Sequence, residues 1–333
     1  MSEPVPTCAY HPGRETYLSC SRCERPICPD CAVNAAVGIR CIGCLSEERG
    51  QKPRVARELT AHSRSLRRPG PLFLVLVAAW LGLCGLLWYL SVRPGAPSGT
   101  VTEMVLGGAF SDIPNVVKLV GAAATVVGWV VSLCIHEWAH AYVAYKSGDE
   151  SVVGKGYLTL DPRKYTDPFL SFLLPVIFLL IGGIGLPGGA VWINRAAIRS
   201  RGRESLMSAA GPATNILFGM ACLAGTHVIG DSAIWLSSAL AFLGWLEFLT
   251  AALNLLPVPG LDGYGIIDPY LPDDIRRSMW EFARYGMFVI FALVLFTPVG
   301  RMLWEFADRG VLAMGVDGVY TAVGELIARP KLL

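Results

Sequence analysis

Two histidines with a glutamate directly after the first lie in one of the least charged parts of the chain. Residues 134–140 read CIHEWAH, so His136 and His140 would project from one face of a helix, one turn apart. Two imidazoles at this spacing can hold one zinc ion, and Glu137 could take a proton from a zinc-activated water. The alternative is that three polar residues fell into an apolar helix by chance. Ionisable groups are costly there, which favours a function.

A catalytic zinc site needs a third protein ligand, and Asp262 is a candidate for it. The stretch NLLPVPGLDG, residues 254–263, ends an apolar run, and its two prolines break the helix. A carboxylate presented by unwound backbone at a helix end would complete a three-ligand site with an open position. The alternative is an ordinary Pro/Gly turn that carries a surface aspartate.

HEWAH followed by NLLPVPGLDG resembles the site-2 protease family of intramembrane zinc metalloproteases, whose motifs are H-E-x-x-H and N-x-x-P-x-x-x-L-D-G. A third element, AAGPATN at 209–215, is similar to the G-P-x-x-N start of a core helix in that family. The resemblance covers roughly residues 70–300. It implies proteolysis of transmembrane helices within the bilayer, usually after another protease has removed the outer domain of the substrate.

The resemblance also assigns roles to individual residues. It implies that the catalytic zinc is held by His136, His140 and Asp262. Glu137 would be the general base, and Asn254 would lie near the substrate to polarise the scissile carbonyl. Asn215 is a weaker candidate for a similar role. Its alternative is an amide in helix packing, since the small residues just before it suit close helix contact.

The N-terminus carries four pairs of metal-ligand residues at one spacing. Seven of the ten cysteines lie in residues 8–44, and His11 stands where an eighth sulfur would be. The pairs are Cys8/His11, Cys20/Cys23, Cys28/Cys31 and Cys41/Cys44. Eight such ligands make two closed structural zinc sites. Their order favours a cross-brace, the first pair with the third and the second with the fourth; a sequential arrangement is the alternative.

This short segment has too little apolar mass to fold alone, so metal ligation would supply the missing free energy. Residues 1–50 hold five Lys and Arg against six Asp and Glu, which gives no basic footprint for phosphate contacts. The spacing resembles a B-box-type zinc finger, a family used mainly for protein contacts. We therefore expect a protein partner for this module and no nucleic acid.

The rest of the chain predicts a polytopic α-helical membrane protein, with five to six transmembrane segments plus a re-entrant hairpin. The sequence is 53% hydrophobic and 16% charged, and its apolar runs are long enough to cross about 30 Å of hydrocarbon. The first run begins at Leu72, so nothing resembles a cleaved signal peptide. Spans are expected at 72–92, 114–145, 206–228, 233–256 and 285–299, with an interfacial stretch at 311–328.

Basic residues predict the topology in the bilayer. Residues 51–70 hold six Lys and Arg and one acid, so the positive-inside rule places this linker and the zinc module in the cytoplasm. Reduced thiols suit that compartment. Residues 168–193 have basic loops on both sides, which predicts a re-entrant hairpin that offers a strand edge to an unwound substrate.

Four parts of the chain follow from these observations. They are a zinc module (1–50), a cytoplasmic linker (51–70), a metalloprotease core (71–300) and a C-terminal tail (301–333). The predicted activity is a zinc endopeptidase of the cell membrane, with one catalytic and two structural zinc ions. The alternative is a non-catalytic membrane adaptor that binds partners through the zinc module.

Overall fold

The computed structural model describes residues 6–34, 39–44, 68–108, 110, 113–165, 193–282 and 286–328. The chain forms two compact units, Met1–Arg68 and Pro69–Leu333, which are considered separately below. The predicted re-entrant hairpin at 168–193, except for its last residue, and nearly all of the basic linker lie outside the described residues.

The N-terminal unit is built from two short hairpins. Strand β1 (Thr7–Cys8) pairs antiparallel with β2 (His11–Glu15), and β3 (Ala32–Asn34) pairs antiparallel with β4 (Ile39–Cys41). A 3-10 helix, η1 (Pro29–Cys31), precedes β3. The buried side chains of the described part of this unit are six cysteines, Thr16 and a single larger aliphatic residue, Ile27. The described part of this unit therefore has little hydrophobic core of its own.

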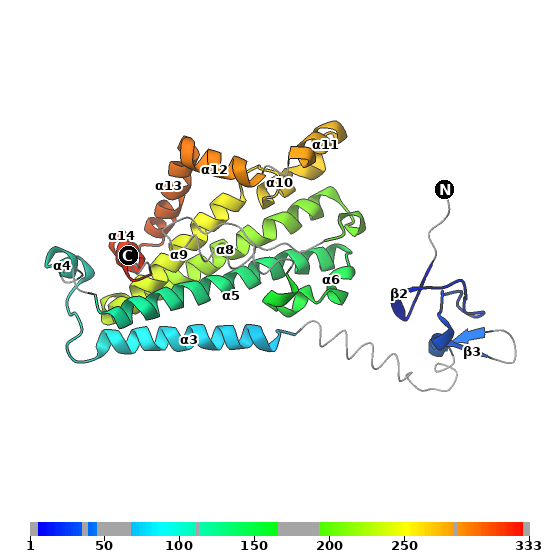
Figure 1. The fold of residues 1–333 in the computed structure, drawn as a ribbon, viewed down its shortest axis with the longest axis horizontal. Helices are drawn as coiled ribbons and strands as arrows, with labels where there is room; N and C mark the ends of the chain where they lie inside the picture. Colours follow the sequence, from blue (N-terminus) through cyan, green and yellow to red (C-terminus); the bar gives the residue numbers. More distant parts are fainter. Residues whose placement is uncertain are drawn as a thin grey trace. The chain divides into compact units, whose positions relative to one another are not determined.

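The second unit is helical (Figure 1). Its α-helices are α3 (Pro71–Val92), α4 (Val101–Leu106), α5 (Asn115–Ser147), α6 (Ser151–Gly154), α8 (Arg201–Ile229), α9 (Ile234–Asn254), α10 (Asp262–Ile267), α11 (Asp273–Phe282), α12 (Gly286–Phe296), α13 (Pro298–Ala313) and α14 (Gly318–Ala328). Short 3-10 helices are η2 (Tyr157–Thr159), η3 (Pro162–Lys164), η5 (Arg195–Ala197), η6 (Gly230–Ala233) and η7 (Asp268–Tyr270).

Among the described residues, three helical stretches are long and apolar enough to cross a membrane: α3, α5 and residues 201–254. Helices α13 and α14, which are bent by 120° relative to each other, would make a fourth if the pair is one span. The third stretch comprises α8 and α9, which correspond to the expected spans 206–228 and 233–256. These two helices run antiparallel, since Thr226 Oγ1 donates to the Ser237 carbonyl at 3.1 Å and Gly219 faces Gly244.

The last predicted span, at 285–299, differs in the structure. Helix α12 has 11 residues, which at about 1.5 Å per residue is only half of the roughly 30 Å of hydrocarbon. The helix stops because Thr297 caps a new one, its side chain accepting from the Val299 backbone N–H, with Pro298 at the first position. Helix α12 is therefore not among the described helices that are long enough to span a membrane, and the count of five to six spans stays a prediction.

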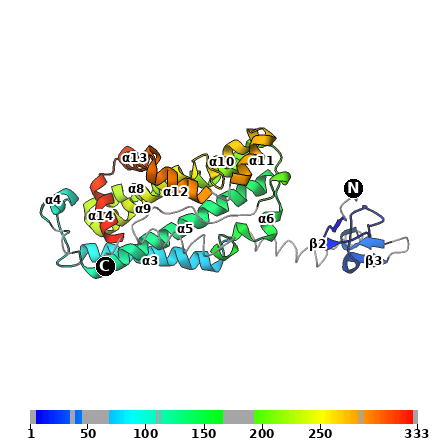
Figure 2. The ribbon, with the colours of Figure 1, turned by 45° about the horizontal axis from the view of Figure 1, so that its top comes forward.

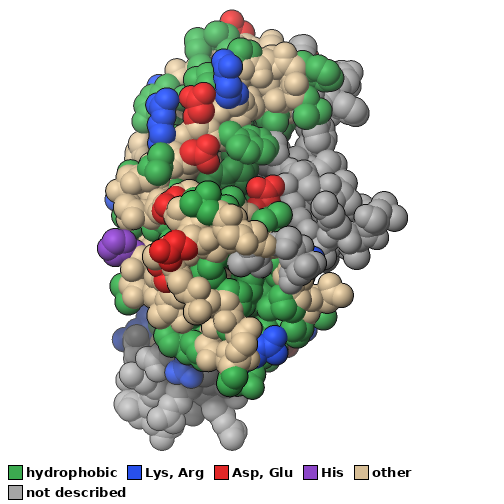
Figure 3. All heavy atoms as spheres, turned by 90° about the vertical axis from the view of Figure 1, so that its left-hand side faces the viewer, with side chains coloured by type: hydrophobic (Ala, Val, Ile, Leu, Met, Phe, Trp, Pro, Cys, Tyr) green, Lys and Arg blue, Asp and Glu red, His purple; other side chains and the backbone are tan. Residues whose placement is uncertain are grey.

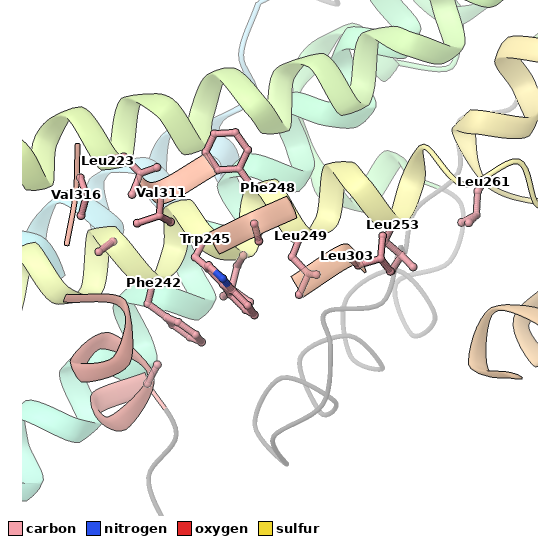
Figure 4. Close-up of a cluster of buried hydrophobic side chains, with 14 of the residues drawn as sticks. Leu223, Phe242, Trp245, Phe248, Leu249, Leu253, Leu261, Leu303, Val311 and Val316 are labelled. Carbon is pink, nitrogen blue, oxygen red and sulfur yellow. The ribbon is translucent and has the colours of Figure 1, made fainter. Parts of the chain in front are cut away.

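Residues 301–328, assigned above to a C-terminal tail, pack on the core. Val311 and Leu303 of α13 lie in one buried cluster with Phe248 and Leu249 of α9 (Figure 4). Helix α14 approaches α9 so closely that a Cβ on Gly324 would lie 2.1 Å from the Ser238 carbonyl oxygen. Small residues at such crossings allow backbones to meet in a membrane protein.

Helix α5 carries the HEWAH motif and lies inside the bundle. Figures 1 and 2 both show it between α3 and the α8–α9 pair. Figure 3 shows the end of the bundle that carries α4, where acidic side chains are scattered among hydrophobic ones. Asp231 holds this end together, accepting from the Val101 N–H at 2.9 Å and from the Tyr320 hydroxyl at 2.7 Å. The HEWAH motif lies in the other half of α5, toward its C-terminus.

Candidate metal centre

The two histidines of HEWAH meet inside the bundle. His136 and His140 are each 5% exposed, and their Nε2 atoms are 3.1 Å apart. One helical turn separates them on α5, so the backbone alone brings the rings to the same face. Glu137, the next residue after His136, is also buried, at 3% exposed.

Asp262 reaches the histidines because α9 ends and the chain turns back. Helix α9 ends at Asn254, and Gly260 adopts a φ of +102°, which favours glycine in this turn. Asp262 is the first residue of α10, and a Cβ on Gly263 would lie 2.1 Å from the Leu255 carbonyl oxygen. Only glycine at 263 lets α10 begin against the last turn of α9.

The three side chains converge on one point. Asp262 Oδ2 lies 3.3 Å from His136 Nε2, and Asp262 Oδ1 lies 3.2 Å from His140 Nε2. Ligands at about 2.0–2.1 Å from a tetrahedral zinc ion are about 3.3 Å from one another. The two nitrogens and the carboxylate therefore fit a zinc ion.

The backbone of α8 lies directly over these ligands. A Cβ on Gly211 would lie 2.3 Å from His140 Nε2 and 2.5 Å from His136 Nε2. Any side chain at 211 would fill the place where the ligand atoms converge. Gly211 is the glycine of the AAGPATN element, and the close approach explains why a glycine stands at that position.

The other ring nitrogens of both histidines are held by α8. His136 Nδ1 lies 2.6 Å from Asn215 Oδ1, and His140 Nδ1 lies 2.7 Å from the Met207 carbonyl oxygen. Because both partners are acceptors, each ring donates from Nδ1 and keeps the Nε2 lone pair for a metal. Pro212 has no N–H to donate to the carbonyl of Ser208, the residue after Met207, so the helical hydrogen bonding is interrupted next to this contact.

Sequence reasoning missed these two contacts. Asn215 was expected to polarise the substrate or to serve in helix packing, and the structure instead shows it hydrogen-bonded to His136. The signal that could have found it is the spacing of Met207, Gly211 and Asn215, which places all three on one face of α8.

Asn254 is the remaining predicted site residue. It is the last residue of α9 and is 5% exposed. Its side chain makes no hydrogen bond to any of the described residues, which include the three candidate ligands.

The N-terminal unit holds two further clusters of ligand atoms. One is formed by Cys8, His11, Cys28 and Cys31, and the other by Cys20, Cys23, Cys41 and Cys44. The first pair thus lies with the third and the second with the fourth, which is the cross-brace and not the sequential arrangement. All ten cysteines of the chain are free thiols.

The distances in these clusters suit zinc. His11 Nδ1 lies 3.3 Å from Cys28 Sγ and 3.2 Å from Cys31 Sγ. In the second cluster the sulfurs of Cys20 and Cys44 are 3.9 Å apart. Sulfurs bound at about 2.3 Å to one tetrahedral zinc lie about 3.8 Å apart. Each cluster offers four ligands and leaves no position open.

Backbone amides prepare two of these thiols for metal binding. Burial raises the pKa of Cys8, but hydrogen bonds from backbone N–H groups, that of Cys28 first, outweigh it and bring the pKa down to about 6. Burial likewise raises the pKa of Cys20, and the Cys41 N–H among others lowers it to about 6. Thiolates are the form that binds zinc, so both residues are ready ligands at neutral pH.

Comparison with known proteins identifies close relatives. The chain is 38% identical over 234 residues to "Putative zinc metalloprotease Rip2" of Mycolicibacterium smegmatis, covering 69% of this chain and 82% of the relative. The protein of the same name from Mycobacterium tuberculosis is 38% identical over 232 residues, or 69% of this chain and 80% of the relative. "Putative zinc metalloprotease YwhC" of Bacillus subtilis is 36% identical over 184 residues, 53% of this chain and 81% of the relative.

No protein-family profile and no solved structure matches the chain. The alignments nevertheless cover most of the length of these relatives at well over 30% identity. The names of the relatives agree with the zinc-binding geometry of α5 and α10. Helices apolar enough to cross a membrane accompany that geometry. The chain therefore belongs to the site-2 protease family of zinc metalloproteases and is a metallopeptidase of the membrane.

Proposed function

We propose that the protein is an intramembrane endopeptidase, which hydrolyses peptide bonds within the transmembrane segments of other membrane proteins. The observation that carries this proposal is the position of His136 and His140, which meet Asp262 of α10, along α5, a helix of 33 residues. His140 lies seven residues before the end of α5, about 10 Å along its axis, and His136 lies about 16 Å from that end. A site at this depth suits a substrate within the bilayer.

Each side chain has a distinct task in this reaction. A zinc ion held by His136, His140 and Asp262 supplies Lewis-acid activation of the water nucleophile and of the peptide carbonyl. Glu137 accepts the proton of the attacking water and returns it to the leaving amine. Asn254 holds the scissile carbonyl once the substrate helix has unwound. The substrate is a transmembrane protein, which another protease can first shorten.

The test uses the full chain in liposomes that contain a library of single transmembrane segments with short flanks. Cleavage inside the apolar segment, located by mass spectrometry, is the expected result. Glu137→Gln should lower the rate by about 10²–10⁴-fold while zinc content stays unchanged. Glu150→Gln, at an exposed position, is the matched control.

Three results would contradict the proposal. Cleavage by the Glu137→Gln protein at the parental rate would remove the general base from the mechanism. Cleavage of soluble casein but of no transmembrane segment would place the reaction outside the bilayer. A protein that cleaves nothing but retains partners through its N-terminal module would be an adaptor.

We further propose that the N-terminal module is cytoplasmic, holds two structural zinc ions and recruits a protein partner or substrate. The four-ligand clusters support this role because closed sites stabilise a fold and leave no room for a substrate. Elemental analysis should find three zinc ions per chain. In inside-out vesicles of the cell membrane, an added protease should reach both the module and a tag placed near residue 198; protection of either would contradict this topology.

A further inference from the structure

A carboxyl group without an assigned role lies deep inside the bundle. Glu247 of α9 is fully buried, and its Oε2 atom accepts from Ser132 Oγ at 2.6 Å and from Asn215 Nδ2 at 2.6 Å. Its other oxygen, Oε1, has no hydrogen-bond partner among the described residues. An acidic residue within a membrane-length helix is expensive to bury, so a role is expected for it.

Asn215 connects this carboxyl to the candidate zinc ligands. Its amide nitrogen donates to Glu247, and its Oδ1 lies 2.6 Å from Nδ1 of His136. The opposite nitrogen of that ring, Nε2, faces Asp262 at 3.3 Å. A continuous row of hydrogen bonds therefore runs from α9 through α8 to the metal site on α5.

The direction of these hydrogen bonds decides which ring nitrogen is available. An asparagine amide has one donor end and one acceptor end, and a half-turn exchanges them. If the NH₂ group faced His136, Nδ1 would have to accept, the ring proton would move to Nε2, and that nitrogen could not bind a metal. With the oxygen facing His136, the proton stays on Nδ1.

Glu247 selects the arrangement in which the Asn215 oxygen faces His136. Its Oε2 already receives the Ser132 hydroxyl, and it is an acceptor whether or not Oε1 carries a proton. The end of Asn215 that faces it must therefore be the donor. Helices α8 and α9 pack closely at this point, because a Cβ on Gly219 of α8 would lie 3.1 Å from the Glu247 Cβ.

We propose that Glu247 is a positioning residue of the zinc site: it fixes the orientation of the Asn215 amide and thereby the tautomer of His136 that binds the metal. This inference rests on the zinc site of the proposed function, and it does not depend on which substrate is cleaved.

The test is the affinity of the membrane site for zinc, measured by competition with a chelator on the full chain. Glu247→Leu removes the acceptor and should weaken zinc binding by about 10–100-fold. Glu247→Gln keeps an oxygen for the Asn215 amide and should stay much closer to the parent. Ser238→Ala is the matched control, since Ser238 is a buried polar residue of the same helix whose hydroxyl has no partner among the described residues.

A second readout follows the proton itself. Nitrogen NMR of the ring of His136 should show the proton on Nδ1 in the parent and in Glu247→Gln, and a mixture of tautomers in Glu247→Leu. If Glu247→Leu does not fold, Ser132→Ala replaces it. That variant removes one hydrogen bond to the same oxygen and should weaken zinc binding in the same direction, by less.

A double-mutant cycle separates this role from general destabilisation. In an Asn215→Leu protein the route from Glu247 to His136 is already cut, so adding Glu247→Leu should change zinc affinity no further. Parental zinc affinity in Glu247→Leu, or equal losses in Glu247→Leu and Glu247→Gln, would overturn the proposal. A parent that binds zinc but cleaves no segment would contradict the proposed function and leave this inference standing.

Discussion

The N-terminal module and the membrane bundle both gather metal ligands, but they do so in opposite ways. In the module, two sets of four ligands hold short hairpins whose buried side chains are almost all cysteine. In the bundle, three ligands meet between long helices that have large apolar clusters of their own. We therefore expect the module to need a metal ion in order to fold, and the bundle to fold without one.

The number of ligands follows the same division. Four ligands complete a tetrahedron and leave a structural ion inert, while three leave a position for a reacting molecule. Gly211 keeps that position clear in the bundle, and nothing comparable is required where the tetrahedron is closed. The contrast predicts that mutations in the two regions will separate stability from activity.

The largest expected effect is loss of a module ligand. Cys28→Ser should unfold the module, because structural zinc supplies an apparent free energy of about 10–16 kcal/mol. Limited proteolysis and zinc analysis should show a digested N-terminus while the bundle keeps its zinc. Cys84→Ser, in α3, is the control and should leave module zinc unchanged. An intact module in the Cys28→Ser protein would contradict the expectation that the module, unlike the bundle, needs its metal in order to fold.

Loss of a bundle ligand should act on activity alone. Asp262→Ala should abolish zinc binding at that site and lower cleavage by at least the roughly 10²–10⁴-fold expected for Glu137→Gln. The melting temperature of the zinc-free bundle should change little, since its apolar clusters remain. Asp273→Ala, an exposed aspartate of α11, should have neither effect. Unfolding of the bundle by Asp262→Ala would mean that its metal is structural as well.

A smaller effect is expected from filling the space above the ligands. Gly211→Ala puts a methyl group against both Nε2 atoms, which should cost about 1–3 kcal/mol in strain or displace zinc. Gly202→Ala in the same helix meets nothing closer than 3.9 Å and should be neutral or stabilising. Thermal melting and zinc content measure both. Equal behaviour of the two variants would contradict the close approach of α8.

The smallest effect should come from an ion pair on the module surface. Arg14 and Asp30 form a salt bridge in which both side chains are more than half exposed. Arg14→Ala should leave module melting and zinc content without a measurable change, because solvent screens such pairs. A clear loss of zinc in this variant would show that the module depends on more than its ligands.

Local sequence predicted the parts of the site that depend on one helix or one turn. The four-residue spacing in HEWAH and the proline-glycine break before Asp262 each needed only neighbouring residues, and the structure places both as expected. The order of the cysteine pairs favoured the cross-brace that the structure shows, but it left a sequential arrangement open. The relatives confirm the family resemblance.

The rest depended on how helices meet. Asn215 and Glu247 reach α5 from α8 and α9, and the register between those helices cannot be read from any one of them. The predicted span at 285–299 failed for a local reason that apolarity concealed, because Thr297 and Pro298 start a new helix within it. Hydropathy counts apolar residues but does not register a cap inside an apolar run.

The length of α5 makes the position of the metal site in the membrane depend on the thickness of the bilayer. Thirty-three residues make a helix of about 50 Å, well beyond the roughly 30 Å of a hydrocarbon core, so the helix must tilt or extend into the headgroups. A thicker bilayer draws the motif further from the aqueous phase, and a thinner one brings it closer. Acyl-chain length is thus a physical setting that changes how readily water reaches His136 and His140, without any change in the protein.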